Sequence, residues 1–351
     1  MAETSLSRRG EWQPQEATIM GWPGLEGSLK LDPERLASVT KEVSFLAQAI
    51  AHFQPVVLVV GNARVDEAEK YFSTVETPFP IRLHRIDGND LGFQMRDIAP
   101  TFVAKQDSGP VGVDYNFNGW GERDSTPTAT KFAQTFLGDR GTECIKTSIV
   151  AEGGALETDG EGTLLVTESS IINDNRNPGK TREDIEDELK RTLGLEKIIW
   201  IPGRKDTDST DRHISALARF ARPGVVVLSK ANEEKESDWT VTYQEALEIL
   251  SSVTDAKGRP FEIIEVEEPD PTFFDSSKDG DRPVRSYVNY TLVNGGIIVP
   301  QFGDPAHDAA AIRTFQMLFG DERRIFPILI EELPKLGGGI HSSTQELPRY
   351  P

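Results

Sequence analysis

The sequence predicts an α/β protein built from a repeated module. Short apolar strands alternate with helical stripes along its 351 residues, which is the pattern of α/β folds. Units that contain strands and one helix each recur about every 60–80 residues, a period that favours a repeated module over a doubly wound sheet. No Gly-x-Gly-x-x-Gly follows a predicted strand, so a dinucleotide site is not expected.

The N-terminal part sets the pattern that the rest repeats. Residues 17–21 form an apolar run between turns and predict a first strand. A helix is predicted over 33–53, because Pro33 suits a first helical turn and apolar residues recur along one face. Pro55 ends this helix, and the uninterrupted apolar run 56–60 predicts a buried strand.

The later elements are predicted from the same signals. In chain order they are a helix over 63–73, strands over 81–86, 97–104 and 111–114, a helix over 131–137, a strand over 164–167, a helix over 182–193 that Thr181 caps, strands over 197–201 and 225–228, a helix over 242–252, strands over 262–266, 286–293 and 296–299, a helix over 305–319 and a strand over 324–328.

The charge of the chain bears on its partners. A formal net charge of −19 and a pI of about 4.8 favour solubility and cationic small substrates over polyanions. Nucleic-acid binding needs clustered Lys and Arg, and the Arg pairs at 8–9 and 323–324 are isolated. We therefore expect no nucleic-acid partner.

The cysteine, histidine and apolar residues of the chain bear on its cellular compartment and on metal binding. Cys144 is the single cysteine, which excludes an intramolecular disulfide and fits a reducing compartment. Residues 1–5 contain neither a basic segment nor an apolar run, so no secretory signal is expected. No stretch approaches the roughly 18 apolar residues of a membrane helix, so we expect a cytoplasmic location. The five histidines show no metal-binding spacing, and no metal site is predicted.

Four loops gather the polar residues that are suited to chemistry. They cover 89–100, 151–163, 206–215 and 336–348, and most lie beside a predicted strand end, where α/β folds often place their sites. In the last loop, the glycines at 337–339 let the backbone turn sharply and approach a ligand. A histidine and two serines follow. The loop can therefore present a nucleophile, and Ser342 is the residue in position.

Seven short motifs follow one another along the chain, at 11–18, 116–121, 152–154, 159–163, 175–178, 300–304 and 337–341. In this order they resemble the agmatine deiminase branch of the peptidylarginine-deiminase-like, guanidine-modifying superfamily. The resemblance covers nearly the whole chain. It implies a pentein-type five-bladed α/β propeller, in which five ββαβ modules surround a pseudo-fivefold axis as one domain over 1–351. It also implies a small guanidino substrate, no cofactor, a place in putrescine and polyamine biosynthesis, and homodimers, which are common in the family.

The resemblance further implies a reaction and the residues that perform it. In the family a thiolate attacks the guanidinium carbon, ammonia leaves, and water releases a ureido product, while a His shuttles protons and a Glu orients it. Carried over, Asp97 binds the guanidinium, Glu152 orients His213, and His213 is the general acid and base. Further substrate-binding candidates are Arg96, Trp120, Asp208, Ser215, Gly339 and His341.

The chain departs from the family pattern at the reacting positions. Ser342 stands where the family has its nucleophilic Cys, and Ser215 stands where it has a second guanidinium-binding Asp. A thiol with a pKa near about 8.5 supplies thiolate readily, whereas a serine needs a base at the instant of attack. Loss of one charge-assisted pair also costs about 1.5–3 kcal/mol of substrate binding. Deimination is therefore expected to be very slow. Smaller departures are Gln94 for Trp, Ala99 for Gly and Arg212 for Gly.

Three functions remain open on these residues. The first is a deiminase-family hydrolase that is inactivated but still recognises agmatine, arginine or a related guanidino compound. The second is a diverged enzyme in which Ser342 and His213 attack an ester while Asp97 holds an arginine-like side chain, as in an acyl transfer. The third is a non-catalytic protein that binds a guanidino ligand.

Overall fold

The computed structural model describes residues 6–26, 31–105, 109–231, 238–274 and 283–350. Residues 1–5, on which the expectation of no secretory signal rests, lie outside these ranges. Within the described ranges, every helix is too short or too polar to cross a bilayer.

The described strands form five sheets, and four of them are built in the same way. Each contains an antiparallel strand pair, then a helix, then a strand parallel to the second strand of the pair. The predicted α/β repeat is therefore confirmed. The four units are β5 (Thr101–Lys105), β6 (Gly109–Asp114), α5 (Pro127–Asp139) and β7 (Cys144–Lys146); β8 (Glu157–Thr158), β9 (Thr163–Thr167), α7 (Arg182–Leu193) and β10 (Lys197–Ile201); β11 (Ala218–Arg222), β12 (Val225–Lys230), α8 (Asp238–Ser252) and β13 (Glu262–Glu267); and β14 (Thr291–Val293), β15 (Gly296–Gln301), α9 (Pro305–Phe319) and β16 (Arg324–Leu329).

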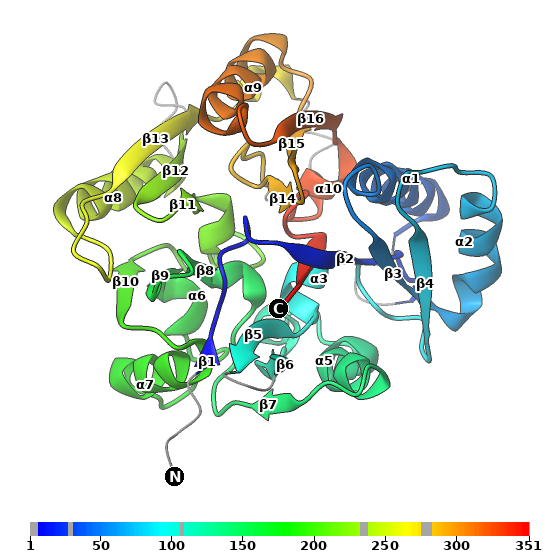
Figure 1. Ribbon diagram of the computed structural model, residues 1–351, viewed down its shortest axis with the longest axis horizontal. Helices are drawn as coiled ribbons and strands as arrows, with labels where there is room; N and C mark the ends of the chain where they lie inside the picture. The colour runs from blue at the N-terminus through cyan, green and yellow to red at the C-terminus, as the bar shows by residue number, and fades with distance from the viewer. Residues whose placement is uncertain (1–5, 27–30, 106–108, 232–237, 275–282, 351) are drawn as a thin grey trace.

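The remaining sheet joins the two ends of the chain. The C-terminal strand β17 (Thr344–Pro348) pairs antiparallel with β2 (Gln15–Gly21), and β3 (Val56–Gly61) pairs parallel with β2 after α1 (Pro33–Ile50). The unit therefore has the same strand directions as the other four, but its first strand comes from the end of the chain. Figure 1 shows the sheets placed around a common centre with the longer helices outside them. The glycine loop before β17 is thereby brought to the centre.

Shorter elements complete the described chain. They are β1 (Leu6–Ser7), which pairs with β5; α2 (Val65–Phe72) and β4 (Ile81–Ile86), which extend the first sheet; the short helices α3 (Met95–Ile98), α4 (Gly119–Glu122), α6 (Glu168–Ile171) and α10 (Glu332–Lys335); and the 3-10 turns η1 (Asn62–Arg64), η2 (Gly153–Ala155), η3 (Ile214–Ala216) and η4 (Pro271–Phe273).

Local sequence signals explain the helix ends. The Asp32 side chain accepts hydrogen bonds from two backbone N–H groups of the first turn of α1. Thr181 and Asp184 bond each other's backbone at the start of α7 in a capping box. Gly194, in the left-handed region at φ 67°, ends the same helix. The predicted cap at Thr181 is therefore confirmed.

Several predicted boundaries were wrong by three residues or more. The strand expected over 97–104 begins only at Thr101, because residues 95–98 turn into α3, whose Asp97 and Ile98 N–H groups bond the Gln94 carbonyl. The strand expected over 286–293 covers only its last three residues, since Asn289 N–H bonds back to Ser286 in a turn. The helix expected over 131–137 starts at Pro127, after the Thr126 cap. The first two errors both fall on residues that build the site below.

Candidate functional site

Three short turns meet around Gly154. The turn α3 packs against η2, and η2 packs against η3. The Gly154 N–H donates to Asp97 Oδ1 at 2.9 Å. A side chain on residue 154 would lie 2.6 Å from His213 Nδ1, 2.7 Å from Asp97 Oδ1 and 3.3 Å from Ser215 Oγ. Glycine at this position therefore allows the side chains of Asp97, His213 and Ser215 to converge.

Asp97 is a buried carboxylate that is held on both oxygens. Its Oδ2 accepts the indole N–H of Trp120 at 2.9 Å, and its Oδ1 accepts Gly154 N–H. Trp120 has a left-handed backbone at φ 54°, a conformation that costs a bulky residue about 1–3 kcal/mol and is concentrated at functional sites. Burial raises the pKa of Asp97, although the charge of His213 opposes the shift. Each carboxylate oxygen has a second lone pair, so Asp97 can still accept N–H groups from a ligand.

His213 lies between two carboxylates. Its Nε2 is 3.3 Å from Glu152 Oε2, and its Nδ1 is 3.6 Å from Asp97 Oδ1. Burial alone would lower the pKa of His213, but the charge of Asp97 and the contact with Glu152 outweigh it and raise this pKa. The predicted pairing of Glu152 with His213 is thus present, and the geometry favours a protonated imidazole.

We expect an NMR titration of the His213 ring to give a pKa above the ordinary value of about 6.5. The raised pKa means that the pairing stabilises the fold fully below about pH 6.5 and that this contribution disappears as the pH rises through the folded pKa. Asp97→Asn should lower the His213 pKa, because it removes one of the two charges. An unchanged titration in Asp97→Asn would contradict this electrostatic explanation.

Arg176 links Glu152 to Asp211 on the side of Glu152 that does not contact His213. Neither Arg176 nor Asp211 was among the predicted site residues. Arg176 Nε donates to Glu152 Oε1 at 2.9 Å, and its Nη1 donates to Asp211 Oδ2 at 2.6 Å; all three side chains are fully buried. Burial would raise the pKa of Glu152, but Arg176 and His213 lower it, so Glu152 is held ionised. The signals in the sequence were the 175–178 motif around Arg176 and the 206–215 loop, which contains Asp211.

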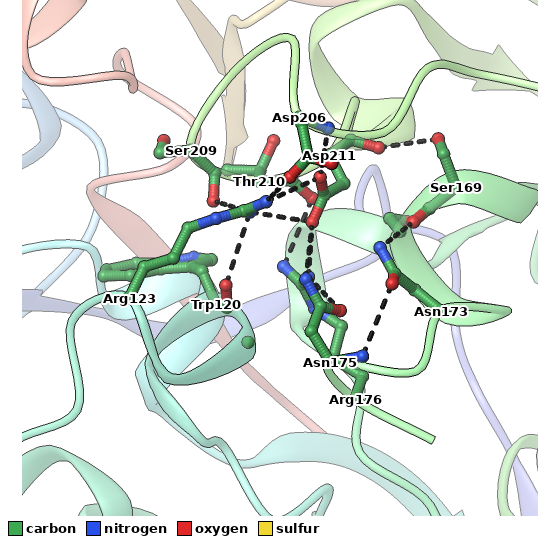
Figure 2. A network of polar contacts seen from close by, with 12 residues as sticks. Trp120, Arg123, Ser169, Asn173, Asn175, Arg176, Asp206, Ser209, Thr210 and Asp211 are labelled. Atoms are coloured by element: carbon green, nitrogen blue, oxygen red, sulfur yellow. Dashed lines mark hydrogen bonds and ion pairs between the residues drawn. The ribbon is translucent and has the colours of Figure 1, made fainter. Parts of the chain in front are cut away.

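Figure 2 shows Asp211 at the centre of a dense polar network. Arg123 donates to both of its oxygens, at 2.7 and 2.9 Å, and Asn175 donates at 3.2 Å. Burial opposes ionisation, but these donors lower the pKa of Asp211 to about 2. The carboxylate therefore fixes the loop that leads into His213.

Asp208 stabilises the same loop from inside. Its Oδ1 accepts the N–H groups of Thr210 and Arg212 and the Thr210 hydroxyl, at 2.7–3.1 Å. Asp211 and Arg212 both have left-handed backbones, at φ 59° and 67°. Asp208 thus supports a strained turn. Its predicted contact with substrate stays a prediction.

The glycine loop is tied to the other turns through its backbone. Asn289 Oδ1 accepts the N–H groups of His341 and Ser342, at 3.0 and 3.5 Å, and Asn289 Nδ2 donates to the Ser215 carbonyl at 3.5 Å. A side chain on Gly339 would collide with Asn289 Oδ1, so Gly339 is needed for this contact. The Ser342 carbonyl accepts Arg96 N–H at 3.1 Å. Residue 342 is therefore anchored beside Asp97 and Ser215.

The two serines of the loop differ in their surroundings. Ser343 is buried and its hydroxyl donates to the Gly339 carbonyl at 2.8 Å. Ser342 is partly exposed. The predicted choice of Ser342 as the residue that faces a ligand agrees with this difference in exposure.

The side chains of Arg96 and His341 lie away from Asp97, in a buried ion cluster. His341 Nε2 is 2.8 Å from Glu11 Oε2, which also accepts from Arg219 at 2.7 Å, and Arg96 pairs with Glu11 and Glu346. Burial and the charges of Arg219 and Arg96 lower the pKa of His341 well below its usual range, so it is neutral. Both side chains are therefore paired with carboxylates of the protein, and their predicted contact with substrate stays a prediction.

The chain matches the Porphyromonas-type peptidyl-arginine deiminase family over residues 7–348. It belongs to this family. Among its curated relatives, agmatine deiminase of Medicago truncatula is 33% identical, with 96% of this chain and 95% of the relative aligned. Agmatine deiminase of Pseudomonas savastanoi pv. phaseolicola is 35% identical, with coverage of 96% and 94%.

A solved structure supports the same family membership. The agmatine deiminase of Enterococcus faecalis, described as catalysing its reaction, superposes with a TM-score of 0.86 at 28% identity over 99% of each chain. The family resemblance that the motifs predicted is therefore confirmed, and the mixed α/β fold is that of agmatine deiminases.

Proposed function

We propose that this deiminase-family protein binds a small guanidino compound at Asp97, beside His213 and Glu152. The observation that carries the proposal is the convergence of Asp97, His213 and Ser215 around Gly154. A guanidinium is planar and donates paired N–H groups, which a fixed carboxylate accepts well. The family relation and the two agmatine deiminase relatives support agmatine as the first ligand to test.

The proposed architecture is a pentein-type five-bladed propeller that forms one domain over 1–351. Five sheets that repeat the same strand directions support it. The C-terminal strand β17 completes the sheet that contains β2 and β3. The family resemblance also supports a homodimer, a cytoplasmic location and a role in polyamine metabolism, which stay predictions.

We further propose that deimination is strongly slowed in this chain. The reaction needs a nucleophile at residue 342 to bond to the guanidinium carbon while the C–N bond to the leaving nitrogen breaks and His213 passes a proton to that nitrogen. Water then releases the ureido product and frees the nucleophile. A serine hydroxyl must lose its proton during attack on a resonance-stabilised cation, and Ser215 supplies no second carboxylate. Acyl transfer from an arginine-bearing ester and simple ligand binding are the alternatives, and both would retain the contact at Asp97.

Asp97→Asn tests the binding proposal. It keeps the shape of the side chain but removes the charge, so agmatine affinity measured by calorimetry should fall at least about tenfold. Asp206→Asn is the matched control, because Asp206 is exposed and pairs with Arg123 at the edge of the network. Its affinity should stay within about twofold of the unmodified chain. Equal affinity for Asp97→Asn and the unmodified chain would refute the proposed site.

A further inference from the structure

A cavity lies between the end of β13 and the segment that precedes β14. Its volume is about 280 Å³, and its walls include Trp239, Phe274, Glu268, Arg285 and Ser286, with three prolines. Small-molecule pockets begin near about 300 Å³ and combine apolar walls with a few polar groups. The cavity therefore has the size and composition for a small organic group.

Glu268 is the acidic group of this cavity. Its Oε1 accepts the Ser229 hydroxyl at 3.0 Å. Within the described part of the chain, Glu268 forms no ion pair, and Arg212 acts on it only through its charge. Burial raises the pKa of Glu268 to about 7, against the effects of Ser229 and Arg212. The carboxyl therefore has acceptor capacity left, and a cation beside it would favour its ionised form.

The aromatic walls are rigid supports. The Arg212 guanidinium lies 3.3 Å from the centre of the Trp239 ring, and Arg285 lies 3.7 Å from the centre of the Phe274 ring. Arg212 is 2% exposed, and its Nε and Nη1 have no hydrogen-bond partner among the described residues. The Arg212 guanidinium therefore fixes the position of the Trp239 ring. A ring in a fixed position can pack against the alkyl chain of a ligand.

The cavity is adjacent to the loops of the proposed site. Arg212, which supports Trp239, directly precedes His213. The Ser286 carbonyl accepts the N–H of Asn289 at 3.1 Å, and Asn289 contacts both Ser215 and Ser342. A molecule in the cavity would thus touch residues that are one contact away from two of the site loops.

We propose that this Glu268 pocket is a second binding site, which takes the ammonium or guanidinium group of a small alkyl cation on Glu268 while Trp239 and Phe274 contact its chain. Glu268 is the acceptor that selects a cation, and the two nearby guanidiniums, of Arg212 and Arg285, lie over the rings of Trp239 and Phe274. The proposal does not require the guanidino function proposed for the Asp97 site.

Glu268→Gln tests the pocket with n-butylammonium as the probe. The amide keeps the size of the side chain, so the affinity measured by calorimetry or ligand-observed NMR should fall at least about tenfold if an ion pair is lost. Glu267→Gln is the matched control, since Glu267 is exposed at the end of β13, directly before Glu268, and pairs with Lys230. It should change the affinity less than about twofold. Phe274→Ala, on a partly exposed wall, should also weaken binding. Affinity in Glu268→Gln equal to that of the unmodified chain would overturn the proposal.

Agmatine, which carries two cations, distinguishes the source of the bound group. If the pocket holds the amine end of a molecule whose guanidinium is at Asp97, agmatine binds once per chain, and both Asp97→Asn and Glu268→Gln weaken it. If the pocket takes a separate molecule, two agmatines bind per chain, Asp97→Asn weakens only one of them, and Glu268→Gln weakens only the other. Both results support the pocket. Agmatine binding that Asp97→Asn does not affect would refute the proposed function alone.

Discussion

The double variant Ser342→Cys, Ser215→Asp is expected to produce ureido product and ammonia from agmatine at least about a thousandfold faster than the unmodified chain. The cysteine supplies a thiolate at neutral pH, because a nearby imidazolium lowers the thiol pKa. The aspartate restores a second acceptor for the guanidinium. The rest of the site is already assembled, with His213 between Asp97 and Glu152. Colorimetric ureido detection together with an ammonia assay measures the rate.

The neighbouring serine provides a control for this experiment. Ser343→Cys with Ser215→Asp adds a thiol one residue further along, where the side chain is buried against the Gly339 carbonyl. That variant should remain as slow as the unmodified chain. Failure of the Ser342→Cys double variant to gain activity, with an unchanged fold, would contradict the assignment of residue 342 as the nucleophile position.

Arg176→Met is expected to lower the free energy of unfolding by about 3–5 kcal/mol. The substitution leaves the Glu152 and Asp211 carboxylates buried without the cation that pairs with both. Urea denaturation at neutral pH measures the change. Partial recovery at low pH is also expected, since protonation of Glu152 removes a buried charge that has lost one of its two partners, Arg176, and keeps only His213.

Arg182→Met is the matched surface comparison. Arg182 pairs with Glu168, and the two side chains are 44% and 38% exposed. Its loss should change the free energy of unfolding by less than about 1 kcal/mol. Similar losses in the two variants would show that Arg176 does not act as the buried support of the site.

Much of the fold could be predicted because its signals are local. The apolar run 56–60 and the cap at Thr181 each determine an element from neighbouring residues alone. The repeated strand and helix order then indicated the module. By contrast, the pairing of β17 with β2 joins residues at opposite ends of the chain, and no local pattern contains that information.

The candidate site could be predicted in its loops but not in all its contacts. Family motifs identified Asp97, Glu152 and His213, which the structure brings together. They did not separate Arg96 and His341, which point into the ion cluster around Glu11, from ligand-facing residues. Nor did they reveal Arg176 as the partner of Glu152, because a buried ion pair depends on which side chains the fold places opposite each other.

The left-handed backbone of Trp120 shows why side-chain contacts of the site could not be predicted from the sequence. Its indole reaches Asp97 only because its backbone has φ 54°, a conformation that propensity disfavours for a large side chain. The family motifs predicted Trp120 as a substrate contact. The structure shows it as a donor that orients Asp97, and a direct contact with the ligand stays a prediction.

The most direct measurement is incubation of the unmodified chain with excess agmatine, followed by mass spectrometry of the bound and free ligand. We predict that one agmatine per chain depends on Asp97 for binding and is recovered unchanged, with ureido product no higher than in a protein-free control. Repeated turnover of agmatine to its ureido product would contradict the claim that Ser342 and Ser215 leave this deiminase-family site able to bind but very slow to react.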